Sequence, residues 1–343
     1  MAKASFRRIV QDLAEAGSRG ALGDEPLALV AKHEARLEGL TAHARPLRVV
    51  TSKELLSMDL PPRELILSPI LRKKDLAMFH AWRGTGKTWL GLGIAAAVAA
   101  GGKFLAWQAP KPAGVLFVDG EMPVEAIQER LTIILESCDL EPDDRLKIVT
   151  PDLLEHGVPN LATPRGQAQI EQHLNGVELL VLDPLSALFR GDIAENESES
   201  WNSAQEFMLR LRRGGVTCVL MHHSGKEGRQ RGTSKREDVL DLVVALRHPR
   251  NYSATEGARF EVHFEKARAA FGKDVEPFEA QLTNRSGGGH AWTVRDLVAQ
   301  TYAETVRLSQ EGLTQPEIAK ELGKNKSTIS RHLKTAREKG DLP

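Results

Sequence analysis

Short apolar runs alternate with amphipathic segments through the middle of the chain. The apolar runs are Leu76–His80, Gly114–Asp119, Leu146–Thr150, Val177–Asp183 and Val216–His222. Helical periodicity fills most of the intervals, at Trp89–Ala100, Val124–Glu136, Arg165–Asn175 and Ser200–Arg212. Buried strands separated by helices predict an α/β fold, a mostly parallel sheet with helices on both faces.

After residue 235 the pattern changes to longer strand-like runs. Val239–Arg247, Arg259–Ala267 and Pro277–Thr283 are predicted to add strands at one edge of the sheet. Asn284–His290 is rich in glycine and is predicted to be a flexible connector. Beyond it, Val294–Leu342 is predicted to form a compact helical bundle.

The first 45 residues carry two helix-like patterns separated by glycines, which predict an N-terminal helical segment. An oligomerisation arm, a partner-binding helix pair and a solvated appendage all agree with this pattern. Thr51 followed by Glu54 resembles a capping box that opens a short helix. The predicted domains are therefore a helical arm and linker over 1–60, an α/β domain over 61–290 and a helical domain over 291–343.

The composition is that of a globular protein, with 41% hydrophobic and 27% charged residues among 343. The formal net charge is +0, so any contact with nucleic acid depends on a local basic patch. Cys138 and Cys218 show no metal or redox spacing and are predicted to be core residues in a reducing compartment. The longest apolar stretch, Leu90–Gly102, is too short to span a bilayer, so we expect a cytoplasmic protein with no membrane partner.

A phosphate-binding loop follows the first strand of the α/β region. Gly84-Thr85-Gly86-Lys87-Thr88 fits the second half of G-x-x-x-x-G-K-[ST], with Ala81 in place of the first glycine. The glycines let backbone N–H groups surround a phosphate at a helix N-terminus. Lys87 is predicted to reach the β and γ phosphates of ATP, and Thr88 to bind Mg²⁺. The residues expected around the nucleotide are Arg83, Gly84, Thr85, Gly86, Lys87, Thr88 and Trp89.

Two later strands end in carboxylates. Val177–Asp183 makes Asp183 the candidate for holding Mg²⁺ through water, the Walker B role. The strand Gly114–Asp119 is followed by Glu121, which is placed to polarise the attacking water as a general base. The alternative for Glu121 is a solvated loop carboxylate. Asp119 is the less favoured base, because a residue at a strand end can simply cap the following turn.

In combination these motifs resemble the RepA-like ATPases, plasmid- and phage-associated members of the RecA/DnaB superfamily. The resemblance spans Pro61 to Val294 and rests on HAWRGTGKT, VLFVDGEM, LLVLDPLSALFRGDIAENES, VLMHHSGK and RGTSKREDVLD. It implies a RecA-like ATPase that forms a ring, commonly a hexamer. Glu121 would be the catalytic carboxylate, Asp183 the metal aspartate, and His222 or His223 the sensor of the γ-phosphate. Asn196 also falls in a family pattern.

A cation supplied by a neighbouring subunit commonly neutralises charge on the γ-phosphate. Lys266 and Arg268 lie two residues apart, and so on one side of a predicted edge strand, where the resemblance implies such a residue. The alternative is an edge strand protected by charge against aggregation. Arg231 and Arg247 are further contenders, and this chain has Asp241 where the best-known plasmid helicase of the family carries its arginine.

The C-terminal segment LTQPEIAKELGKNKSTISRHLKTAREKGDL has a helix-turn-helix pattern. Thr314 is predicted to cap a helix with Ile318, Ala319 and Leu322 inward, Gly323 to form the turn, and Ser327 to cap a second helix packed through Ile329 and Leu333. Lys324 to Lys339 holds six Lys or Arg and one acid, a net charge of +5. The segment resembles DNA-reading domains, in which the N-terminal half of the second helix enters the major groove. The residues expected at DNA are Lys324, Lys326, Ser327, Thr328, Ser330, Arg331 and Lys334, with Arg337 near phosphates. A small bundle with a solvated basic face is the alternative.

Three functions agree with these features. The first is an ATP-driven ring that moves on single-stranded DNA. The second is an ATP-switched initiator, loader or regulator of a mobile element that binds a duplex site without unwinding it. The third is an ATPase whose C-terminal bundle binds a protein. The acidic segment Asp192–Glu199 argues against DNA running over that loop in the first case.

Overall fold

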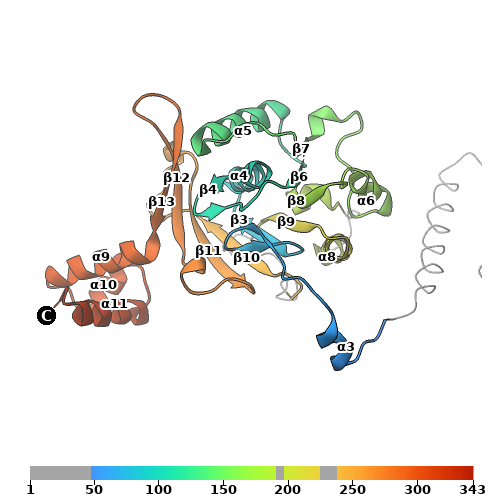
Figure 1. Cartoon of the computed structure of the whole chain (residues 1–343). Coiled ribbons are helices and arrows are strands. Elements are labelled where there is room, and N and C mark those ends of the chain that lie inside the picture. The colour runs from blue at the N-terminus through green and yellow to red at the C-terminus, as the bar shows by residue number, and fades with distance from the viewer. Residues whose placement is uncertain (1–47, 191–196, 225–237, 343) are drawn as a thin grey trace, which may run out of the picture. The chain divides into compact units, whose positions relative to one another are not determined.

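The computed structural model describes residues 48–190, 197–224 and 238–342 (Figure 1). The chain divides into two compact units, Met1–Pro62 and Arg63–Pro343. In the described part of the first unit, helix α3 (Ser52–Ser57) opens with the predicted capping box, in which Thr51 and Glu54 bond each other's backbone and side chain. The N-terminal helical patterns lie outside the described residues.

Nine of the described strands of the second unit form one sheet, in the order β13-β12-β11-β10-β3-β9-β8-β6-β7. The strands are β3 (Leu76–Ala81), β6 (Gly114–Asp119), β7 (Leu146–Val149), β8 (Val177–Asp183), β9 (Thr217–His223), β10 (Leu242–Arg247), β11 (Arg259–Ala267), β12 (Phe278–Asn284) and β13 (His290–Asp296). The pairs from β10 to β7 are parallel, and those from β10 to β13 are antiparallel. Two short hairpins lie outside the sheet, β1 (Leu65–Leu67) with β2 (Leu71–Arg72) and β4 (Lys103–Phe104) with β5 (Trp107–Gln108).

Helices cover both faces of the sheet, as the sequence predicts (Figure 1). The helices of the α/β region are α4 (Lys87–Ala100), α5 (Val124–Cys138), α6 (Pro164–Glu171), α7 (Leu185–Leu188) and α8 (Glu197–Arg213). One apolar core lies between the sheet and α4 and α5, and a second lies between the sheet and α6, α7 and α8. Single 3-10 turns occur at Pro151–Leu153, Ala254–Glu256 and Gly272–Val275. Successive residues of the central strands therefore face alternate cores, which fixes the direction of the polar side chains at the strand ends.

The predicted connector at Asn284–His290 is wrong. These residues close a hairpin: Asn284 pairs with His290, and β13 runs antiparallel to β12 along its whole length. A Gly-rich loop is compatible with a linker or with a hairpin turn, and strand β13, which follows it, alternates only weakly in hydrophobicity. Helix α9 begins at Leu297, so the helical bundle starts after β13.

The bundle comprises α9 (Leu297–Gln310), α10 (Gln315–Leu322) and α11 (Lys326–Lys339). It has its own apolar core, which includes Ile318, Ile329 and Leu333. Thr314 forms a capping box with Glu317, and Gly323 ends α10 in the left-handed conformation, both as predicted. The predicted cap at Ser327 is wrong. Asn325 holds the N-cap position, because the tight turn after Gly323 lets α11 start two residues earlier.

Candidate functional site

The phosphate loop joins the buried strand β3 to the N-terminus of α4. Gly84 and Gly86 have φ values of +80° and +116°, a region that residues with a Cβ rarely adopt. The Thr85 side chain donates to the carbonyl of Trp82 at 2.9 Å and closes the turn. No side chain caps the start of α4, so its first N–H groups are directed into the loop and are available to an anion.

Gly86→Ala is expected to damage this loop more than Gly84→Ala. A Cβ at Gly86 would lie 2.8 Å from the ring of Phe260, whereas a Cβ at Gly84 has nothing within 4 Å. Both substitutions carry the backbone cost of a positive φ, about 1–2 kcal/mol, and Gly86→Ala adds a steric clash. Thermal unfolding of the two variants measures the difference. An equal drop in Tm would contradict this packing of Phe260 under the loop.

Lys87 is buried at the start of α4, with a relative exposure of 6%. Its Nζ lies 3.5 Å from the carbonyl oxygens of Ala81 and Trp82. Burial lowers the pKa of Lys87, and the carboxylates of Asp183 and Glu121 oppose that effect. The ammonium is therefore held inside the loop among acidic groups, without a short hydrogen bond that a phosphate would have to break.

Four neighbouring strands bring polar groups to one edge and one face of the sheet. Ala81 aligns with His223 on β9, and Asp183 on β8 aligns with Asp119 on β6. Side chains alternate along a strand, so each of these residues lies on the same side as the residue two positions earlier. Those earlier residues all belong to the core beneath α4: Phe79, Met221, Val181 and Phe117. The face is therefore the one on which the phosphate loop and α4 lie.

Asp183 is the buried carboxylate of this group, with an exposure of 2%. Burial raises its pKa to about 6, and a hydrogen bond from the Thr88 side chain lowers it in part. Its Oδ2 atom accepts no hydrogen bond from the described residues. A buried carboxylate oxygen without a donor, beside a threonine hydroxyl, is the ligand set that Mg²⁺ prefers, so these two residues fit the ion.

Asp119 has a different role. Its Oδ2 accepts hydrogen bonds from the backbone N–H groups of Glu121 and Met122, at 3.1 and 2.7 Å. Burial raises its pKa to about 6. Asp119 therefore caps the turn after β6, as the sequence reasoning allowed, and the cap fixes the direction in which Glu121 leaves the strand.

The two buried aspartates make stability depend on pH. Both pKa values are raised from 3.8 to about 6, so between these values the folded protein binds more protons than the unfolded chain. Stability from these groups is therefore lost as the pH rises through this window. Asp183→Asn removes one of them, so its free energy of unfolding relative to the unaltered protein is expected to grow from pH 4 to pH 7. Urea unfolding across this range measures the difference, and a difference that shrinks with pH would contradict the burial.

Glu121 and His223 form a pair at the mouth of the site. Nε2 of His223 lies 3.7 Å from Oε1 of Glu121, whose side chain is 50% exposed. Burial lowers the pKa of His223, as do the charges of Lys87 and Arg83, while Glu121 raises it. His223 is thus an imidazole kept neutral near a half-exposed carboxylate. The Glu121 charge raises the pKa of Lys87, and the Lys87 charge lowers the pKa of His223.

His222 lies on the opposite face of the sheet, because it is the neighbour of His223 on a strand. It is buried at 7% exposure and aligns with His80 of β3. The sequence left His222 and His223 as equal candidates for the γ-phosphate sensor. The alternation of β9 places His223 on the side of the phosphate loop.

The basic residues that could act on the γ-phosphate of a neighbouring subunit lie at different ends of the parallel strands. Arg268 lies beside the amino end of β3, since Ala267 aligns with Leu242 and Leu242 with Ala77. Its guanidinium donates to the carbonyl of Asp238 at 2.7 Å and lies 3.5 Å from the buried Asp241 carboxylate. Lys266 aligns with Val243 on the same half of the sheet.

Arg247, in contrast, follows Leu246, which aligns with Ala81 at the phosphate-loop edge. Its guanidinium bonds Glu265 at 3.2 Å, and its side chain is 51% exposed. Asp241 is buried, and its carboxylate accepts a hydrogen bond from the Leu76 N–H at 3.1 Å. It therefore has a structural role at the start of β3. Arg231 and Asn196 lie outside the described residues.

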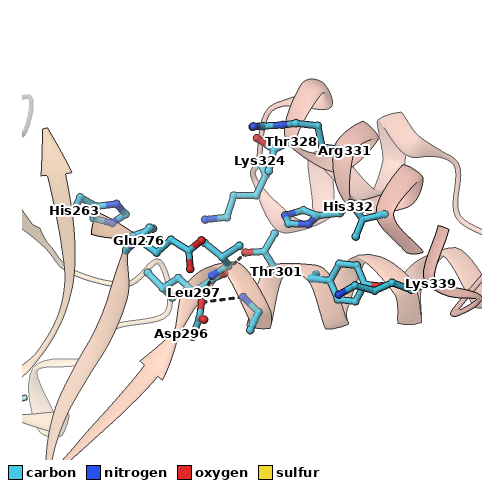
Figure 2. A pocket seen from close by; sticks show the side chains of 15 residues that line it. His263, Glu276, Asp296, Leu297, Thr301, Lys324, Thr328, Arg331, His332 and Lys339 are labelled. Atoms are coloured by element: carbon cyan, nitrogen blue, oxygen red, sulfur yellow. Dashed lines mark hydrogen bonds between the residues drawn. The ribbon is translucent and has the colours of Figure 1, made fainter. Parts of the chain in front are cut away.

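The predicted DNA-contacting side chains lie along α11 and the turn before it. Lys324, Thr328 and Arg331 line a pocket of about 760 Å³, with His263 and Glu276 on its opposite wall (Figure 2). Figure 2 shows Lys324 extending into this pocket from the α10–α11 turn. Lys326, Ser327, Ser330 and Lys334 are exposed and do not line it. The basic residues therefore divide between a solvent face and a face turned toward β11 and the segment before β12.

The fold and the loop define a P-loop nucleotide-binding protein with a helix-turn-helix domain. A family model described as AAA domain matches residues 42–229, and the chain belongs to this family. A second model, described as homeodomain-like domain, matches residues 303–343. The chain is thus a P-loop ATPase of the AAA domain family with a C-terminal homeodomain-like domain.

Solved structures also resemble the chain. One is a KaiC-like protein from the hyperthermophilic archaeon Pyrococcus horikoshii OT3, with 15% sequence identity and a TM-score of 0.47. The match covers 72% of this chain and all of that one (100%). No curated protein matches the sequence. Among the described residues, no helix is long and apolar enough to cross a membrane.

Proposed function

We propose that this protein binds Mg²⁺-ATP at the phosphate loop, hydrolyses it, and couples the nucleotide state to DNA bound by the homeodomain-like domain. The observation that carries the proposal is the arrangement at one edge and one face of the sheet. There the buried Lys87, the buried Asp183 with a free carboxylate oxygen, and the Glu121–His223 pair surround one phosphate-binding turn.

The residues have separate roles in this account. The N–H groups of the loop and the Lys87 ammonium bind and orient the triphosphate, and they balance charge that develops on the γ-phosphate. Thr88 and Asp183 would hold Mg²⁺, and the ion would supply positive charge that balances the triphosphate. Glu121 accepts the proton of the attacking water. Its half-exposed carboxylate follows the turn that Asp119 caps, so it is accessible to a water molecule at the mouth of the site. His223, kept neutral, bonds the γ-phosphate or the water between them.

The resemblance to RepA-like ATPases supports a ring in which a neighbour completes the site. Arg247 is the contender that lies at the same sheet edge as the phosphate loop. Lys266 and Arg268 lie toward the amino end of β3, the opposite end of that strand from the phosphate loop of their own subunit. We therefore propose Lys266 or Arg268 for action in trans within a ring. A hexamer is the expected assembly.

ATP turnover without DNA, with single-stranded DNA and with duplex DNA tests this proposal and separates its two forms. Strong stimulation by single strands supports a ring motor and calls for an unwinding assay. Stimulation by duplex alone, or duplex binding without stimulation, supports an ATP-switched initiator, loader or regulator. Turnover that neither DNA affects, together with no DNA binding, refutes the coupling.

The α11 side chains give a prediction about that binding. Arg331→Ala is expected to weaken binding to a preferred duplex sequence, by about 1–3 kcal/mol if it reads a base. Lys334→Ala is expected to weaken binding to all DNA sequences about equally. It should also reduce the slope of log K against log salt concentration by roughly one unit. Fluorescence anisotropy at several salt concentrations measures both. The exposed Lys103, on the β4 hairpin, gives a matched control, and Lys103→Ala should bind as the unaltered protein does.

A further inference from the structure

His80 is a buried titratable residue for which the proposed chemistry has no use. It lies on β3 immediately before Ala81, with 1% exposure, on the face opposite the phosphate loop. Its Nδ1 lies 2.9 Å from the hydroxyl of Ser224, and its Nε2 lies 2.9 Å from Oε2 of Glu265. These partners are 144 and 185 residues away in sequence. One side chain therefore joins strands on both sides of β3.

Two features of the sheet let His80 contact Glu265 across strand β10. His80 aligns with Ala245 on β10, whose small side chain leaves room for the imidazole to extend across that strand. On β11 the register shifts, because Val243 aligns with Lys266 and Val244 with Phe264. Glu265 is thus the extra residue of a β-bulge, a feature that redirects a side chain. The other carboxylate oxygen of Glu265 bonds Arg247 at 3.2 Å.

The hydrogen bonds have a defined direction. A carboxylate only accepts, so Nε2 of His80 carries the hydrogen that bonds Glu265. In the neutral ring Nδ1 then accepts from the Ser224 hydroxyl. The hydrogen bond from His80 lowers the pKa of Glu265, and so does the charge of Arg247. Each hydrogen bond from Ser224 through His80 and Glu265 to Arg247 therefore has a defined donor and acceptor.

The other end of this chain touches the phosphate loop. The carbonyl oxygen of Ala81 accepts from the backbone N–H of Ser224 at 2.8 Å. The same oxygen lies 3.5 Å from Nζ of Lys87. If a bound phosphate drew the Lys87 ammonium away from this oxygen, the carbonyl would keep only its hydrogen bond from Ser224. A change at the loop thus acts directly on Ser224, which follows His223 in the chain.

We propose that His80 is a positioning residue that couples occupancy of the phosphate loop to the β11 bulge and to the orientation of Arg247. The coupling runs from Lys87 through Ala81 and Ser224 to His80, and then through Glu265 to Arg247. It moves no proton and makes no bond to the nucleotide. The coupling would change the positions of two basic residues. These are the exposed Arg247 at the phosphate-loop edge and Lys266, the next residue after the bulge. The inference rests on the proposed binding of ATP.

NMR of the full chain with ¹³C-labelled histidine rings tests the coupling. The His80 signal is identified by its absence in His80→Gln. It is expected to shift when Mg²⁺ and the slowly hydrolysed analogue ATPγS are added, and to stay in place in Ser224→Ala. The control is His173, an exposed histidine outside the sheet. Its signal is expected not to move.

Kinetics supply a second readout that a purely structural role would not affect. His80→Gln keeps a donor for Glu265 but loses the link to Ser224, and it is expected to lower kcat about 5- to 10-fold with little change in KM, the size of a moderate coupling. His173→Gln should match the unaltered protein. A His80 signal that does not shift when ATPγS binds would refute the coupling, and so would equal kcat values in the two variants. Either result would leave the proposed binding of ATP intact. Failure of the unaltered protein to bind ATPγS overturns the proposed function as well.

Discussion

Replacing Lys87 by alanine is expected to lower ATP turnover by at least about 10²- to 10³-fold, the usual effect of removing a charge that stabilises the transition state. Lys87 is the buried cation of the phosphate loop, and among the described residues its nearest carbonyl oxygens lie 3.5 Å away. A phosphate offers this ammonium shorter and charged hydrogen bonds. The variant should therefore lose both tight nucleotide binding and hydrolysis.

Removing the Lys87 charge is expected to stabilise the nucleotide-free protein. Burial lowers the pKa of Lys87, so folding disfavours the charged form at neutral pH. Lys87→Met, which keeps the length and removes the charge, is expected to raise the Tm of the nucleotide-free protein. Steady-state phosphate release and thermal unfolding measure the two effects. A Lys87→Met variant that is both active and less stable would contradict the site.

Replacing Glu121 by glutamine is expected to separate binding from hydrolysis. The amide keeps the shape of the side chain but cannot take a proton from water, so turnover should fall by about 10²- to 10⁴-fold. The affinity for ATP should change little, because Glu121 lies at the mouth of the site and not in the loop. Single-turnover hydrolysis and equilibrium binding of ATP provide the comparison. Glu125→Gln, a change to the exposed carboxylate in the first turn of α5, is the control expected to behave as the unaltered protein.

His223 reports the same change. The Glu121 carboxylate raises the pKa of His223 against the effects of burial and of Lys87. Glu121→Gln removes that charge, so the pKa of His223 is expected to fall further, as an NMR titration would show. A pKa that rises in the variant would mean that the pair does not exist in solution. Unchanged turnover would remove Glu121 from the chemistry.

The sequence predicts what depends on local chemistry. The phosphate loop, the buried strands with carboxylates at their ends, and the capping boxes at Thr51 and Thr314 all follow from residues within a few positions of each other. Helices on both faces of the sheet and extra strands at one edge follow from the periodicity. Strand β13 does not, because a Gly-rich loop reads equally as a linker or as a hairpin turn.

The sequence does not predict which side chains on different strands contact one another. Adjacent histidines alternate between two faces, and only the phase of β9 tells His223 from His222. The contact of Arg268 with Asp241 joins residues 27 apart, and no short pattern marks it. The link from His80 to Glu265 depends on a bulge, which appears only when β10 and β11 are paired. A histidine before a phosphate loop gives no signal that could have revealed it.

Calorimetric titration of ATPγS into the full chain, with and without Mg²⁺, tests whether the phosphate loop binds Mg²⁺-ATP. We expect one nucleotide bound per chain, an affinity that requires Mg²⁺, and loss of binding in Lys87→Ala. Loss of the Mg²⁺ requirement in Asp183→Asn would agree with the role of that carboxylate. Absence of binding by the unaltered protein, or equal binding by Lys87→Ala, would contradict the account.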